Sequence, residues 1–178
     1  MKKEFIRLSG MLFVITLVAA FVLAGVNAIT KEKIAEAEKN TSIQAMKVLF
    51  PEADEFKEIN ESVNESFKDG QSIGFCVNTA PKGYGGEIKL LVGIDNENKV
   101  TGIEVLSHSE TPGLGAKSTG DSFKSQFKGK ETDLNVVKTQ TQSPGEVQAI
   151  TGATVTSRAV ADGIREANAI IEEIKGEK

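Results

Sequence analysis

The residues best suited to chemistry lie in the run ITGATVTS, at residues 150–157. A helix-like spacing of apolar residues follows, so Thr154 stands at the expected start of a helix, just after Gly152 and Ala153. The first turn of a helix leaves about four N–H groups without partners and carries about half a positive charge. Small residues let a ligand approach the backbone closely. The run is therefore suited to hold a phosphate beside the Thr154 hydroxyl.

A simpler interpretation is that Thr151 or Thr154 only caps the helix. Threonine is a favoured N-cap residue, and a single cap stabilises a helix by about 1 kcal/mol. Gly-Ala-Thr ahead of a helix is weak evidence for a ligand site when it stands alone. The rest of the sequence must decide between the cap and the phosphate site.

The elements around this turn are predicted from periodicity. Residues 147–150 are expected to form a short strand, and residues 155–175 a helix that ends near Gly176. The turn at residues 151–154 joins them. The apolar stripe of the helix recurs every three or four residues and consists of Val160, Ile164, Ala167 and Ile171.

The middle of the chain is predicted to be a sheet. Residues 72–78 form the first clear strand, and residues 87–94 alternate apolar and other residues as a half-buried strand does. A turn at 95–98 and a strand at 100–106 complete a β-hairpin. A short helix at 121–127 and a short strand at 134–138 follow. We therefore expect an α+β fold with a largely antiparallel sheet and flanking helices.

Two glycine-rich loops lie at the ends of this hairpin, at residues 81–86 and 108–117. Binding residues often occupy such loops on a rigid frame, although proline and glycine also suit a plain turn. Neither loop has the spacing of a Walker A motif or of a Rossmann fingerprint.

Composition excludes several classes of function. The 178 residues carry a net charge of −4, of which the first 30 residues contribute +2, so the rest of the chain carries −6. An acidic body argues against nucleic-acid binding. The single cysteine, Cys76, and the single histidine, His108, give no internal disulfide, no Cys₄ site and no predicted metal centre. Cys76 is expected to be a small buried apolar residue.

The N-terminal part of the chain is predicted to be a membrane anchor. Residues 11–29 are 19 residues without a charge, about 28 Å of helix. Lys2, Lys3 and Arg7 precede them, which leaves the N-terminus in the cytoplasm and the acidic body outside it. A cleaved signal peptide is the alternative, but its apolar region is typically about 7–15 residues. We expect a single-pass protein of the cytoplasmic membrane: a cytoplasmic segment 1–8, a transmembrane helix 9–29, a helical and acidic connection 30–70, and a folded domain 71–178.

Three segments in this order behind one anchor resemble a known family. They are GYGG at 83–86 followed by VGID at 92–95, HSETPGLG at 108–115, and TGAT at 151–154. The chain is similar to the G subunit of Rnf electron transport complexes, which is related to the C subunit of the sodium-translocating NADH:quinone oxidoreductase. The resemblance implies that residues 71–178 bind FMN, joined by a phosphoester bond to Thr154. It also implies that a separate flavin transferase attaches the FMN. This chain has Gln148 where members often carry Asp.

The resemblance also suggests roles for neighbouring residues. Tyr84 is a candidate for stacking on the flavin ring, and Lys117 for neutralising the phosphate. The other cofactor-binding residues that we expect are Glu110, Thr111, Gly113, Leu114, Thr151, Gly152, Ala153, Val155 and Thr156.

The implied function is electron relay. The chain resembles a membrane flavoprotein subunit of a ferredoxin:NAD oxidoreductase coupled to ion translocation, acting with other membrane subunits and without catalytic residues of its own. One alternative is the C subunit of the related quinone reductase or another exported flavoprotein. A different alternative is a non-enzymatic, membrane-anchored binding module.

Overall fold

The computed structural model describes residues 2–176, with side chains from residue 6 onward except those of residues 32, 35 and 38. The ends of the predicted segments 1–8 and 71–178, residues 1, 177 and 178, lie outside this range. The chain divides into two compact units, residues 1–41 and 42–178, and each is considered by itself.

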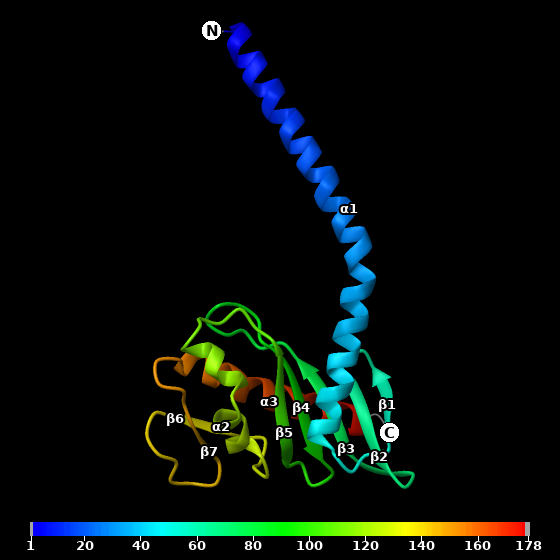
Figure 1. The fold of residues 1–178 in the computed structure, drawn as a ribbon. Coiled ribbons are helices and arrows are strands. Elements are labelled where there is room, and N and C mark those ends of the chain that lie inside the picture. The colour runs from blue at the N-terminus through cyan, green and yellow to red at the C-terminus, as the bar shows by residue number, and fades with distance from the viewer. Residues whose placement is uncertain (1, 177–178) are drawn as a thin grey trace. The chain divides into compact units, whose positions relative to one another are not determined.

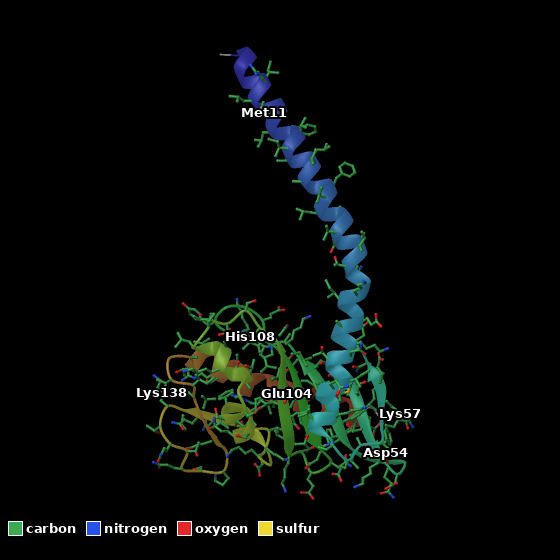
Figure 2. All side chains as sticks on the ribbon, in the orientation of Figure 1. Met11, Asp54, Lys57, Glu104, His108 and Lys138 are labelled. Carbon is green, nitrogen blue, oxygen red and sulfur yellow. The ribbon has the colours of Figure 1, made fainter. Side chains whose placement is uncertain are left out.

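The described part of the first unit, residues 2–41, is helical. Helix α1 (Lys2–Leu49) contains a stretch, Ile6–Lys31, that is long and apolar enough to cross a membrane by length and composition. Figure 2 shows apolar side chains projecting from this helix near Met11, and the large apolar residues of the stretch are exposed. The expected helix at 9–29 is thus present, and it continues through residues 30–41. Helix α1 ends two residues before Pro51, as expected of a residue that cannot continue a helix.

The second unit contains a five-stranded sheet in the order β1-β2-β3-β4-β5, in which every neighbouring pair is antiparallel (Figure 1). The strands are β1 (Glu55–Asn60), β2 (Val63–Lys68), β3 (Gln71–Thr79), β4 (Lys89–Asp95) and β5 (Val100–Ser107). The predicted strand at 72–78 and the predicted hairpin are therefore confirmed, together with the α+β class.

Strands β1 and β2 differ from the expectation, which assigned residues 30–70 to a connection and began the folded domain at residue 71. Strand β1 is an edge strand that is exposed along nearly its whole length, so it carries no apolar alternation to find. The hairpin between β2 and β3 turns at Asp69 and Gly70, which both have positive φ values, 50° and 77°. Asp-Gly is a strong hairpin signal that the sequence analysis passed over.

Strand β4 is buried on both faces, so the half-buried strand expected from its alternation is wrong. Leu90, Val92 and Ile94 pack in the main core, but Leu91 on the opposite face is also fully buried. Leu91 packs in a second cluster with Met46 and residues at the end of α1. The alternation failed because a helix from a distant part of the sequence covers the face that would otherwise be exposed.

Helix α3 (Thr154–Gly176) covers the other face and packs over β3 and β4. Its predicted stripe is confirmed, since Val160, Ile164, Ala167 and Ile171 are all fully buried. Burying each of the larger side chains stabilises the fold by about 1.5–3 kcal/mol. This packing fixes the first turn of α3 relative to the sheet.

The remaining elements are short. They are η1 (Gly115–Thr119), α2 (Asp121–Lys124), η2 (Ser125–Phe127), β6 (Asn135–Val137) and β7 (Glu146–Gln148), of which β6 and β7 form a parallel pair. The predicted helix at 121–127 is present as α2 and η2, and the strands expected at 134–138 and 147–150 are present as β6 and β7.

Cys76 is fully buried in β3, as predicted. Burial raises the pKa of its thiol to about 12, so it is protonated and unreactive at neutral pH.

Candidate functional site

A strand–turn–helix segment presents Thr154. The N–H of Ala153 donates to the Ile150 carbonyl at 2.9 Å, which closes the turn between β7 and α3. Gly152 has a φ of +79°, a conformation that side-chain-bearing residues rarely adopt. A Cβ at Gly152 would also come within 3.1 Å of the Leu114 side chain. Glycine is therefore needed in this turn for two independent reasons.

The first turn of α3 has no side-chain cap. The N–H of Ser157 donates to the Ala153 carbonyl at 3.0 Å, which makes alanine, a poor capping residue, the N-cap. Within the described residues, nothing accepts from the N–H groups of Thr154, Val155 or Thr156, and the hydroxyls of Thr151 and Thr154 make no hydrogen bond. The interpretation of Thr151 or Thr154 as a simple cap is therefore wrong for this structure.

Ser157 stabilises the turn and was missed by the sequence analysis. Its buried hydroxyl donates to the Ala153 carbonyl and accepts from the N–H of Ile150, both at 3.0 Å. It thus ties Ile150, which lies between β7 and the turn, to the start of the helix. A serine four residues after the N-cap was the signal that could have indicated this.

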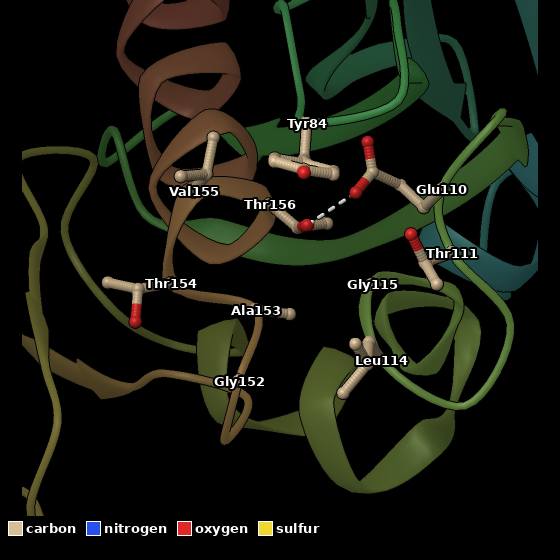
Figure 3. Close-up of a pocket in the computed structure, with 10 residues that line it drawn as sticks. All are labelled: Tyr84, Glu110, Thr111, Leu114, Gly115, Gly152, Ala153, Thr154, Val155 and Thr156. Atoms are coloured by element: carbon tan, nitrogen blue, oxygen red, sulfur yellow. Dashed lines mark hydrogen bonds between the residues drawn. The ribbon is translucent and has the colours of Figure 1, made fainter.

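A pocket of about 580 Å³ opens beside this turn (Figure 3). This volume is within the ordinary range of small-molecule sites, about 300–1,000 Å³. Its lining comes from three segments distant in sequence: Tyr84; Glu110, Thr111, Leu114 and Gly115; and Gly152, Ala153, Thr154, Val155 and Thr156.

The structure brings together most of the residues expected to bind the cofactor. The exceptions are Gly113, Lys117 and Thr151, which are exposed and do not line the pocket. Gly115 lines it and was not expected, although it follows the predicted Leu114 directly. The three motifs therefore meet at one site.

The carboxylate of Glu110, one of the expected cofactor-binding residues, is hydrogen-bonded within the protein. It is 5 % exposed; its Oε1 accepts from the N–H of Gly85 at 2.9 Å, and its Oε2 accepts from the Thr156 hydroxyl at 2.5 Å. Both oxygens are thus engaged by the protein itself. His108 supports the same loop, because its Nδ1 accepts from the N–H of Glu110 at 3.1 Å.

Exposed apolar side chains surround the mouth of the pocket. Tyr84 is 76 % exposed, and Val155 and Leu114 are 52 % and 42 % exposed. Large exposed side chains of this kind often mark a binding surface. A flat aromatic ligand would cover them, and an anion on that ligand would find free N–H donors at α3. The residues present therefore fit a phosphorylated ring compound such as FMN.

Comparison with known proteins agrees with this geometry. Residues 83–169 match the family model of the FMN-binding domain, and residues 1–49 match that of the RnfG N-terminal region. Two crystal structures share the fold with a TM-score of 0.52 each. They are NqrC from Shewanella oneidensis (23 % identity, 65 % of each chain) and the C subunit of the Na(+)-translocating NADH-quinone reductase from Parabacteroides distasonis (28 % identity, 59 % of this chain and 57 % of that one).

Curated relatives match over most of their length. The G subunit of the proton-translocating ferredoxin:NAD(+) oxidoreductase complex from Clostridium ljungdahlii is 39 % identical over 84 % of this chain and 82 % of its own. The G subunit of the Na(+)-translocating complex from Acetobacterium woodii is 36 % identical over 91 % of this chain and 89 % of its own. The expected resemblance is confirmed: this chain belongs to the family of G subunits of ion-translocating ferredoxin:NAD(+) oxidoreductase complexes.

Proposed function

We propose that this chain is the membrane-anchored flavoprotein subunit of such a complex, and that it relays electrons through one FMN esterified to Thr154. The observation that carries the proposal is the first turn of α3, where Thr154, Val155 and Thr156 line the pocket and, within the described residues, their N–H groups and the Thr154 hydroxyl have no hydrogen-bond partner. The membership of the family and the match to the FMN-binding domain support FMN as the ligand.

The residues of the chain would divide the binding between two ends of the ligand. The N–H groups of Thr154, Val155 and Thr156 would hold the phosphate, helped by the helix dipole. Tyr84 and Leu114 would pack on the ring and keep water from it. When bound, FMN supplies an electron carrier that exchanges either one or two electrons.

Attachment requires a second protein. A threonine hydroxyl is a poor nucleophile without a base, and the one ionisable carboxylate in the pocket lining, Glu110, accepts hydrogen bonds from Gly85 and Thr156. We therefore propose a flavin transferase that uses FAD and magnesium. In that reaction the Thr154 oxygen would bond to the phosphorus of the FMN half of FAD, the pyrophosphate bond would break to release AMP, and the hydroxyl proton would pass to a base of the transferase.

The membrane arrangement is also part of the proposal. The apolar helix supports a single-pass membrane protein, and the basic residues Lys2, Lys3 and Arg7 favour a cytoplasmic N-terminus with the domain outside. Tagging each end and testing protease protection in sealed inside-out vesicles checks this. A C-terminal tag that is digested from the cytoplasmic side would contradict the outward orientation.

Intact mass spectrometry tests the core of the proposal. The chain, coexpressed with a flavin transferase, should gain the mass of one FMN less one water, and Thr154→Val should abolish that gain. Thr151→Val is the matched control, because Thr151 belongs to the same turn but lies outside the pocket lining. A wild-type chain without added mass, or a gain that survives Thr154→Val, would overturn the attachment.

A further inference from the structure

Glu110 is a buried carboxylate at the meeting point of the three segments that form the pocket. It belongs to the loop at residues 108–117, its Oε1 accepts from the backbone of Gly85, and its Oε2 accepts from the first turn of α3 through Thr156. The partners lie 25 and 46 residues away in sequence. A single side chain therefore joins both glycine-rich loops to the helix that carries Thr154, and Figure 3 shows its bond to Thr156.

The glycines around Glu110 are needed for this arrangement. A Cβ at Gly83 would collide with the Oε1 of Glu110, and a Cβ at Gly115 would collide with its Oε2. The two loops thus enclose the carboxylate closely, and side-chain-bearing residues at these positions would displace it. Gly83 in one loop and Gly115 in the other are therefore explained by the space that Glu110 requires.

Both hydrogen bonds of Glu110 are ones that its carboxylate accepts. A carboxylate only accepts, and both donors here, an N–H and a hydroxyl, face its oxygens. Glu110 is also the one charged residue of the pocket lining, in which no lysine or arginine takes part. Its negative charge therefore faces no lysine or arginine in the pocket lining, and burial reduces the screening by water.

We propose that Glu110 is a positioning residue that holds the three segments of the pocket together, and that its negative charge lowers the reduction potential of the flavin. This inference rests on the proposed function, because it needs a flavin in the pocket. A negative charge against the ring disfavours the addition of electrons, and charge near the ring is one of the means by which proteins tune flavins. Glu110 acts on the flavin through the shape and the field of the pocket.

Three variants of the full-length flavinylated chain in detergent test the proposal. Glu110→Gln removes the charge and can accept from only one of the two donors. Glu110→Asp keeps the charge but is one methylene shorter, so it cannot reach both donors. Glu87→Gln is the matched control, because it makes the same change at an exposed glutamate that follows the loop at residues 81–86 and lies outside the pocket lining.

Two measurements test the two parts of the proposal: the midpoint potential tests the effect of the charge, and hydrogen exchange tests the positioning role. Spectroelectrochemical titration of the flavin should give a higher midpoint potential for Glu110→Gln than for wild type, while Glu87→Gln and Glu110→Asp stay close to wild type. Hydrogen exchange should be faster in the peptide that contains Gly85 for both Glu110 variants and unchanged for Glu87→Gln. An unchanged potential in Glu110→Gln, or an equal rise in Glu87→Gln, would overturn the proposal.

Failure of this inference is distinguishable from failure of the proposed function. If wild-type protein carries no FMN on Thr154, the proposed function fails at the mass measurement, before any potential is read. The exchange measurement needs no flavin, and unchanged exchange at Gly85 in both Glu110 variants would overturn the positioning role by itself.

Discussion

The two walls of the pocket satisfy their polar groups in opposite ways. The helix wall, residues 152–156, has an alanine N-cap, free N–H groups and a hydroxyl without a partner. The loop wall, Tyr84 and residues 110–115, contains a carboxylate whose two oxygens are both hydrogen-bonded. The helix wall leaves three backbone N–H groups and the Thr154 hydroxyl for a ligand, whereas the loop wall uses its carboxylate to hold the protein together. Residues that line one pocket can therefore have unrelated tasks, and mutation should separate them.

The largest effect is expected at Gly152 on the helix wall. Gly152→Val should destabilise the protein by about 3 kcal/mol, because a β-branched residue is strained at this φ and would press on Leu114. It should also prevent flavin attachment. Urea unfolding followed by circular dichroism, with intact mass, measures both. Gly113→Val is the control: it has a similar φ of +77° but no atom near its Cβ, so it should cost less and leave attachment intact.

Substitutions that break the hydrogen bonds of the loop wall should lower the free energy of unfolding more than they lower flavin attachment. Glu110→Ala leaves the N–H of Gly85 and the hydroxyl of Thr156 without partners, and we expect a loss of about 2 kcal/mol. Thr156→Val, which removes one of the two bonds, should cost about half as much. The same urea titration checks both. Equal stability of Glu110→Ala and wild type would mean that the loop wall is not held by this carboxylate.

A side-chain cap introduced on the helix wall should raise the stability of the protein and slow the attachment of flavin. Ala153→Ser supplies the missing side-chain oxygen, which should stabilise the flavin-free protein by about 1 kcal/mol. The same oxygen would occupy an N–H of Val155 or Thr156 that we assign to the phosphate, so attachment should slow. The rate of mass gain with purified transferase and FAD measures this. A faster reaction would contradict the assignment of those donors.

The smallest effect is expected at Lys117, which is exposed and outside the pocket lining. Lys117→Ala should change the free energy of unfolding by less than about 0.5 kcal/mol and leave attachment unchanged. A clear loss of attached flavin would show that Lys117 reaches the phosphate when the ligand is present, and would extend the site beyond the two walls.

The local parts of this site could be predicted from sequence, and the long-range parts could not. The turn before α3 and the stripe of α3 follow from residue types a few positions apart. The inward orientation of Glu110 depends on Gly85 and Thr156, and no spacing rule connects these residues. Strand β1 was missed because an exposed, charged edge strand carries no apolar period. The second buried face of β4 was missed because the residues that cover it precede it by about forty positions.

The last two turns of α1 have a practical consequence for anyone who wishes to study the domain without its anchor. Residues 42–50 belong to the second unit, and Met46, Leu49 and Phe50 cover Leu91 and Cys76 on the sheet. A soluble fragment that begins at residue 71 would lose β1, β2 and this cover, and would expose a thiol to oxidation and a sheet face to aggregation. Cleavage just before Ser42 should release a fragment in which Leu91 and Cys76 stay covered. Such a fragment can be concentrated for crystallisation or NMR.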